Sequence, residues 1–293
     1  MTLTALNDIC VTAPIKLNLN LHVVGLNQQN YHLLQGVTVF ATDGDRLNIA
    51  FSEHDTDSLT LKGQFSNVLQ SENINQNLVM QAINKLRENF DFPILHITLE
   101  KNIPIQAGYG GGSSDAAAAL KGIIQLCKLQ VTQSVLTKIA QELGADVPMC
   151  LYGKPCLIEN IGDQITPLSL THQGYFCVLL RPNIMSSTPK IFAALNHKIN
   201  PPMVLKSHDT EYVIDYALHQ GRNDLYQAAL TVEPILAIYL HALQDTKPIK
   251  ADMSGSGSGF FALYSSKDRM QNAYETLRHQ FCNDFIMTTY INI

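Results

Sequence analysis

The sequence lacks the features that mark several large classes of protein. Its longest unbroken apolar runs have six residues, as at positions 175–180, whereas a membrane-spanning helix needs about 20. No lysine or arginine precedes Lys16 and no long apolar stretch follows it, so we expect no secretory signal peptide. Lysine and arginine number 20 against 25 aspartates and glutamates, a net charge of −5, which argues against a general nucleic-acid binder. We therefore expect a cytoplasmic protein that binds neither membrane nor nucleic acid.

Metal-binding patterns are also missing. The 6 cysteines form no C-x-x-C pair, and the 10 histidines show neither H-E-x-x-H nor a Cys/His cluster at zinc spacing. Most of the cysteines lie in apolar runs, which favours buried free thiols. We expect no structural metal.

Length and composition indicate a folded protein with about two domains. The chain has 293 residues, and a domain takes roughly 150. Hydrophobic residues make up 46% and charged residues 15%, which excludes intrinsic disorder. The order of expected elements predicts an α+β fold in two parts, residues 1–168 and 169–293.

Hydrophobic periodicity predicts mainly strands in the first hundred residues. Leu17, Leu19 and Leu21 alternate with polar residues, the pattern of a half-buried strand. Residues 37–40 and 47–51 are expected to form two further strands joined by a turn at 43–45. Further on, we expect helices at about 75–90, 113–127, 132–143, 209–218, 224–230, 234–243 and 267–281, and strands at 94–100, 156–161, 175–180, 260–264 and 284–291.

Residues 104–114, the first glycine loop, predict a phosphate site. Four of them are glycines, so the backbone can adopt positive φ and bring its N–H groups close to a ligand. The loop leads from an expected strand into a helix that Ser113 or Ser114 would cap, and the start of a helix attracts phosphate. Either hydroxyl could also reach a phosphate-bound Mg²⁺. A tight turn before a capped helix is the structural alternative.

The best-known nucleotide signatures do not fit this loop. The chain's one Gly-Lys pair is followed by Pro155, so G-x-x-x-x-G-K-[ST] is absent. Ser113 stands where the last glycine of G-x-G-x-x-G belongs, and the H-R-D and D-F-G landmarks of protein kinases are missing.

Residues 253–259, the second glycine loop, read Met-Ser-Gly-Ser-Gly-Ser-Gly. Such a composition is typical of a flexible linker. The segment runs directly into an apolar strand, however, which argues against a linker.

Three groups of side chains are candidates for chemistry, each with a simpler alternative. Lys16 and Asn18 lie on the strand face opposite Leu17, which could be an ordinary solvated face. Asp146 follows an expected helix end and could cap the next helix. Tyr31 and His32 could be ordinary loop surface.

Taken in order along the chain, these segments resemble those of the GHMP kinases, a superfamily of small-molecule kinases. The segments are residues 13–20, the first glycine loop with its helix, and the second glycine loop. Within the superfamily, Gly-Gly-Gly-Ser-Ser at 110–114 and Leu-Gly-Ala-Asp-Val-Pro at 143–148 are most similar to a branch whose substrate carries a cytidine diphosphate group. Gln106 and Ala107 stand where that branch usually has more glycine, and Asp115 stands where it has Asn or Asp.

The resemblance implies a two-domain GHMP-kinase fold. An N-terminal nucleotide-binding α+β domain and a C-terminal α/β-sandwich, ferredoxin-like domain would form a cleft between them. The reaction would transfer the γ-phosphoryl of ATP, with Mg²⁺, to the 2-hydroxyl of a methylerythritol unit in non-mevalonate isoprenoid biosynthesis. Such a transfer relies on positioning and charge stabilisation.

The resemblance also implies roles for individual residues. Asp146 would orient the hydroxyl or accept its proton, and Lys16 would stabilise charge and keep Asp146 ionised. ATP would bind the first glycine loop, which consists of Pro104, Ile105, Gln106, Ala107, Gly108, Tyr109, Gly110, Gly111, Gly112, Ser113 and Ser114. The cytidine diphosphate substrate would bind Asn18, Tyr31, His32, Thr188, Phe192 and Gly257.

Two alternatives remain open. The superfamily motifs alone also allow a kinase of the homoserine or mevalonate type. A catalytically silent nucleotide-binding module is a third possibility, although the presence of both Lys16 and Asp146 argues against it.

Overall fold

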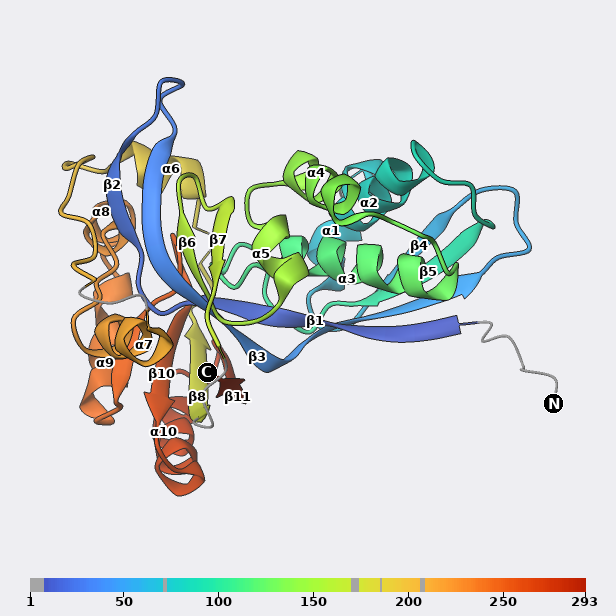
Figure 1. The fold of residues 1–293 in the computed structure, drawn as a ribbon. Helices are drawn as coiled ribbons and strands as arrows, with labels where there is room; N and C mark the ends of the chain where they lie inside the picture. The colour runs from blue at the N-terminus through green and yellow to red at the C-terminus, as the bar shows by residue number, and fades with distance from the viewer. Residues whose placement is uncertain (1–7, 71–72, 170–173, 185, 206–208) are drawn as a thin grey trace. The chain divides into compact units, whose positions relative to one another are not determined.

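A computed structural model of the chain describes residues 8–70, 73–169, 174–184, 186–205 and 209–293 (Figure 1). These residues group into two compact units made of interleaved segments. The first unit contains residues 8–15, 43–105 and 111–152, and the second contains 16–42, 106–110 and 153–293. The division after residue 168 stays a prediction. Among the described helices, none is both long enough and apolar enough to cross a membrane.

The first unit combines a small sheet with a layer of helices. In chain order it holds part of β1 (Asp8–Asn18), part of β3 (His32–Phe51), β4 (Ser58–Lys62), α1 (Ser66–Gln70), the short 3₁₀ helix η1 (Ile74–Gln76), α2 (Leu78–Arg87), β5 (Leu95–Glu100), α3 (Gly111–Leu126), α4 (Gln133–Leu143) and α5 (Val147–Tyr152). Strand β5 pairs antiparallel with β3 and parallel with β4. Its residues Leu95, Ile97 and Leu99 are fully buried, while α2 packs against α3 and α4.

The second unit is built on antiparallel strands and carries the remaining described helices. It holds the rest of β1 and β3, then β2 (His22–Leu26), β6 (Cys156–Glu159), β7 (Gln164–Pro167), β8 (Gly174–Arg181), α6 (Thr188–Ala193), α7 (Thr210–His219), α8 (Leu225–Val232), α9 (Leu236–Asp245), β9 (Lys250–Met253), β10 (Phe260–Tyr264), α10 (Lys267–Gln280) and β11 (Phe285–Asn292). The strand order is β9, β10, β8, β11, all antiparallel. Strand β3 pairs with β2, β6 and the end of β11.

Most of the expected elements are confirmed, some with shifted ends. Thr132 caps α4 and Gly144 follows its last residue, as the sequence predicts. Asn77 caps α2, so the expected helix at 75–90 is shorter and is preceded by η1. The cysteine prediction holds only in part. All six are free thiols, but Cys10 and Cys282 are exposed, and only Cys150, Cys156 and Cys177 are fully buried.

The turn predicted at residues 43–45 is wrong, because β3 continues through it as one strand of 20 residues. Gly44 serves close packing instead of a turn: a Cβ there would overlap the carbonyl oxygen of Ala13. Asp45 satisfies its carboxylate by accepting hydrogen bonds from the backbone N–H groups of Asn102 (2.6 Å) and Ile103 (3.0 Å). Gly44 and Asp45 therefore mark the point where the backbones at Ala13 and Asn102 come close to β3, and not a turn.

Replacing Gly44 tests this reading of β3. We expect Gly44→Ala to lower the free energy of unfolding by about 2 kcal/mol or more, because the added methyl group must displace a neighbouring backbone. Gly25→Ala, also in a strand, is the control: its Cβ would meet only Leu33 Cδ1, at 3.4 Å, and the change should be neutral or slightly stabilising. Urea denaturation of both variants measures the difference. Equal stabilities would contradict the assignment.

Candidate active site

The two glycine loops are hydrogen-bonded to each other within the second unit. The Ser254 hydroxyl donates to the carbonyl oxygen of Gly108 (2.9 Å), and the Gly259 N–H donates to the carbonyl oxygen of Ala107 (2.9 Å). Ser254 and Ser258 are fully buried. The linker interpretation of residues 253–259 is therefore wrong, since a flexible linker would expose these residues to water.

Glycine is required at position 108 for two reasons. Its φ is +73°, and a Cβ there would overlap the carbonyl oxygen of Ser254. The next residue, Tyr109, holds the loop from the other side. Its buried hydroxyl donates to the carbonyl oxygen of Phe260 (2.8 Å), and the carbonyl oxygen of Leu180 is a second acceptor at 3.3 Å. The loop is thus held between β8 and β10 on one side and the second glycine loop on the other.

Lys16 and Asn18 lie in the same network, and their side chains are buried. The Lys16 Nζ donates to Asn18 Oδ1 (2.9 Å), and the Asn18 backbone N–H donates to the Ser254 hydroxyl (3.2 Å). The exposed fractions of Lys16 and Asn18 are 4% and 3%, so the solvated-face alternative is wrong. A Cβ on Gly110 would come within 2.9 Å of Lys16 Cβ. Lys16 therefore lies against the end of the first glycine loop.

The predicted substrate residues of the second unit form two contacts. The rings of His32 and Phe192 touch, with centroids 4.8 Å apart and an angle of 39° between planes. The Thr188 and Ser256 hydroxyls are hydrogen-bonded at 2.8 Å, which links α6 to the second glycine loop. Tyr31 is 63% exposed. Burial and the positive charge of Lys198 lower the pKa of His32, which favours the neutral ring.

In the first unit, α3 begins at Gly111, which places Ser113 and Ser114 inside its first turn. The prediction that one of them caps the helix is therefore wrong. The first N–H groups of α3 have no partner within the helix and can receive an anion. Ser114 is occupied, since its hydroxyl donates to the Pro14 carbonyl oxygen (2.7 Å). The Ser113 hydroxyl makes no hydrogen bond within the described residues, so it is the serine that can reach a phosphate.

Asp146 is close to this helix start through a short series of contacts. The residue is half-buried and immediately precedes α5, which packs against α3. Cys150 donates its N–H to the Asp146 carbonyl oxygen (3.2 Å), and its sulfur lies 3.4 Å from the Ser114 hydroxyl. The first turns of α3 and α5 therefore meet, with Asp146 at the start of α5.

Behind the start of α3 lies a buried triad of charged residues that the sequence reasoning missed. The Lys101 Nζ donates to Asp115 Oδ2 (2.7 Å) and to Asp45. Asp115 Oδ1 is buried and has no hydrogen-bond partner among the residues that the structure describes. Burial and the neighbouring charge of Asp45 raise the pKa of Asp115 to about 7, although Lys101 opposes the shift. Lys101 lies 56 positions from Asp45 and 14 from Asp115 in the sequence, so the spacing of these residues does not predict the triad.

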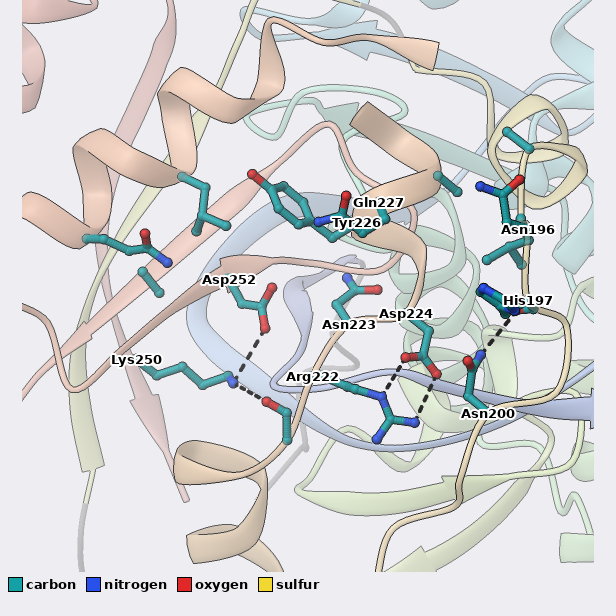
Figure 2. A pocket seen from close by; sticks show the side chains of 17 residues that line it. Asn196, His197, Asn200, Arg222, Asn223, Asp224, Tyr226, Gln227, Lys250 and Asp252 are labelled. Carbon is teal, nitrogen blue, oxygen red and sulfur yellow. Dashed lines mark hydrogen bonds and ion pairs between the residues drawn. The ribbon is translucent and has the colours of Figure 1, made fainter. Parts of the chain in front are cut away.

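A pocket of about 550 Å³ in the second unit contains none of the predicted site residues (Figure 2). Two ion pairs line this pocket: Arg222 with Asp224 (2.6 Å) and Lys250 with Asp252 (3.4 Å). Burial raises the pKa of Asp252. The spacing of these four residues in the sequence does not predict that they line one pocket.

Comparison with known proteins identifies the class of this fold and site. The family profile described as GHMP kinases N terminal domain matches residues 77–154. A solved 4-(cytidine 5'-diphospho)-2C-methyl-D-erythritol kinase superposes with a TM-score of 0.81 at 27% identity, covering 97% of this chain and 100% of that one. A homoserine kinase from Cytophaga hutchinsonii (TM-score 0.71, 17% identity, covering 100% of this chain and 97% of that one) shares the fold. The molecule has the GHMP-kinase fold.

Curated relatives narrow the class to one family. A 4-diphosphocytidyl-2-C-methyl-D-erythritol kinase from Rhizobium meliloti (strain 1021) is 39% identical over 273 residues, which cover 90% of this chain and 89% of the relative. A kinase of the same name from Chelativorans sp. (strain BNC1) is 36% identical, with 94% of each chain covered. This chain belongs to the 4-diphosphocytidyl-2-C-methyl-D-erythritol kinase family.

The triad predicts an unusual dependence of stability on pH. The pKa of Asp115 is about 7 in the folded chain and about 4 in the unfolded chain. Because the folded pKa is the higher one, its contribution to stability is complete below about pH 4 and is lost as pH rises through 7. We expect Asp115→Asn to be more stable than the parent at pH 8, with little difference at pH 4. Urea denaturation at several pH values measures this. A variant that is less stable than the parent at pH 8 would contradict the assignment.

Proposed function

We propose that the chain transfers the γ-phosphoryl group of ATP to the 2-hydroxyl of 4-(cytidine 5'-diphospho)-2-C-methyl-D-erythritol. The products would be the 2-phosphate and ADP, a step in non-mevalonate isoprenoid biosynthesis. The observation that carries this proposal is the 36–39% identity to kinases of that name over 90% or more of the chain. The homoserine and mevalonate kinases share only the fold, at 17% and 14% identity.

In the first unit, the start of α3 would hold the phosphates of ATP. The N–H groups of its first turn and the positive end of its dipole attract negative charge. Pro104, Ile105 and the residues up to Gly110 lead into this turn. The triad of Asp45, Lys101 and Asp115 supports it, because a Cβ on Gly111 would lie only 3.3 Å from Lys101 Nζ. The helix start is thus packed directly on a buried cation.

Asp146 would orient the 2-hydroxyl and accept its proton. It is half-buried and immediately precedes α5. The contacts from Asp146 through Cys150 to Ser114 place it beside the turn that would hold the phosphates. A general base of this kind accelerates a reaction about 10²–10⁴-fold.

In the second unit, Lys16 would stabilise negative charge on the phosphoryl group, with Asn18 holding its ammonium in place. His32 and Tyr31 would bind the cytosine, with Phe192 as a further aromatic surface. A base could lie between His32 and Phe192 only if Phe192 moved, because the two rings already touch. Thr188 and Gly257 would bind the substrate phosphates along the second glycine loop.

The residues at the start of α3 would hold Mg²⁺ only together with the phosphates of a bound nucleotide. Mg²⁺ keeps several waters and is commonly held by phosphates with one or two protein oxygens. The Ser113 hydroxyl makes no hydrogen bond within the described residues and fits this role, whereas the Ser114 hydroxyl donates to Pro14 and the Asp115 carboxylate is bonded to Lys101. Bound there, the ion would neutralise phosphate charge. A cytoplasmic location, where ATP is made and used, agrees with this chemistry.

A substrate panel tests the proposed function. Purified protein with ATP and Mg²⁺ should release ADP with the cytidine diphosphate substrate, and at background rate with homoserine or mevalonate. Preferential turnover of homoserine or mevalonate would assign the chain to another branch. Nucleotide binding without turnover of any of them would indicate a silent module.

Asp146→Asn tests the assigned base. We expect kcat to fall about 10²–10⁴-fold, since the amide cannot accept the proton, while KM for ATP stays within about threefold. Asp55→Asn is the matched control, because Asp55 is exposed in the same unit, and its activity should equal that of the parent. A near-normal kcat in Asp146→Asn, with the fold intact, would rule out this role.

A further inference from the structure

Asn223, which no sequence motif singled out, binds the second glycine loop directly. It lies between α7 and α8, and Figure 2 shows its side chain between the Lys250–Asp252 and Arg222–Asp224 pairs. The Asn223 Nδ2 donates to the carbonyl oxygens of Met253 (2.7 Å) and Gly255 (2.8 Å). Its Oδ1 accepts from the Leu225 N–H (3.0 Å), and only 8% of the residue is exposed. The side-chain amide is therefore fully used.

These bonds determine which way a peptide group of the loop faces. In a trans peptide the C=O and N–H point in opposite directions. Because Asn223 holds the Gly255 carbonyl oxygen, the N–H of Ser256 points away from Asn223. Neither this N–H nor that of Gly255 donates a hydrogen bond within the part of the chain that the structure describes. An N–H held in a fixed direction without a partner is a ready donor to an anion.

The remaining contacts of the loop leave Asn223 as the residue that sets this direction. The Gly257 N–H donates to the Ser254 carbonyl oxygen (3.0 Å), and the Ser256 hydroxyl bonds that of Thr188. These contacts close the turn and fix the Ser256 side chain, but neither holds the Gly255–Ser256 peptide group. We propose that Asn223 is a positioning residue that aims the Ser256 N–H at the diphosphate of the substrate. This inference rests on the proposed function.

Asp224, the next residue, has a different task and supplies a matched control. Its Oδ2 accepts from the Val23 N–H (2.8 Å), and its Oδ1 accepts from Arg222 (2.6 Å). The bond from Val23 attaches the segment to β2, the bond from Arg222 lies within the segment, and neither reaches the second glycine loop. A substitution at Asp224 should therefore affect stability without affecting the direction of the Ser256 N–H.

The test compares Asn223→Asp with Asp224→Asn. The aspartate has nearly the same shape, but a carboxylate oxygen replaces the Nδ2 donor. This oxygen cannot donate a hydrogen bond to the carbonyl oxygens of Met253 and Gly255. We expect KM for the cytidine diphosphate substrate to rise about tenfold in Asn223→Asp, the effect of losing about 1.4 kcal/mol, with KM for ATP unchanged. Asp224→Asn should lower the melting temperature and leave both KM values unchanged. If Asn223→Asp does not fold, Asn223→Ser removes the two donors without adding a charge.

An unchanged substrate KM in a folded Asn223 variant, or an equal rise in Asp224→Asn, would overturn the proposal. Calorimetric binding of CDP to the parent and to Asn223→Asp separates this outcome from a failure of the proposed function. Weaker CDP binding by the variant supports the positioning role even if the parent turns over a different alcohol. Equal CDP binding by both proteins, or none by the parent, overturns it.

Discussion

The pairing of the two glycine loops is the constraint on which the candidate site residues of the second unit depend. Two hydrogen bonds join segments about 150 positions apart in the sequence, from Ser254 to Gly108 and from Gly259 to Ala107. The backbones come so close that a side chain at Gly108 does not fit. Asn18 and Lys16 are held by the same network, because Asn18 donates to Ser254 and accepts from Lys16. A buried ammonium needs such partners, since an unpaired charge away from water is strongly disfavoured.

The first unit also contains a buried ammonium that needs partners, and there the partners are two carboxylates. Gly110, which precedes α3, has no side chain that could cap the helix. Lys101 lies behind the turn, with Asp45 and Asp115 as its partners. Two carboxylates share one ammonium, and Asp115 Oδ1 is buried with no hydrogen bond to any described residue. Burial therefore favours the neutral acid and raises the pKa of Asp115. The buried carboxylate of Asp115 is thus a local destabilising feature, next to the Lys101 ammonium that packs against the start of α3.

Much of the fold could be predicted from the sequence, and several residues of the candidate site could be proposed from it. Periodicity located α4, β10 and α10 closely, because each is bounded by ordinary caps or turns. The turn at Asp43 was predicted wrongly, since Gly44 and Asp45 serve the close approach of Ala13 and the backbone at Asn102, contacts that spacing does not reveal. Resemblance supplied Lys16 and Asp146, which periodicity alone could not separate from a solvated face and a helix cap. Asn223 and Lys101 act on segments distant in the sequence, and only the folded chain shows what they hold.

The pairing of the loops can be measured directly by the hydrogen exchange of the Gly259 amide. This N–H donates to Ala107 across the pair, so we expect slow exchange in the parent protein and fast exchange in Gly108→Ala, where the added methyl group separates the loops. Fast exchange of Gly259 already in the parent protein would mean that residues 253–259 form a flexible linker, and it would contradict the pairing of the two glycine loops.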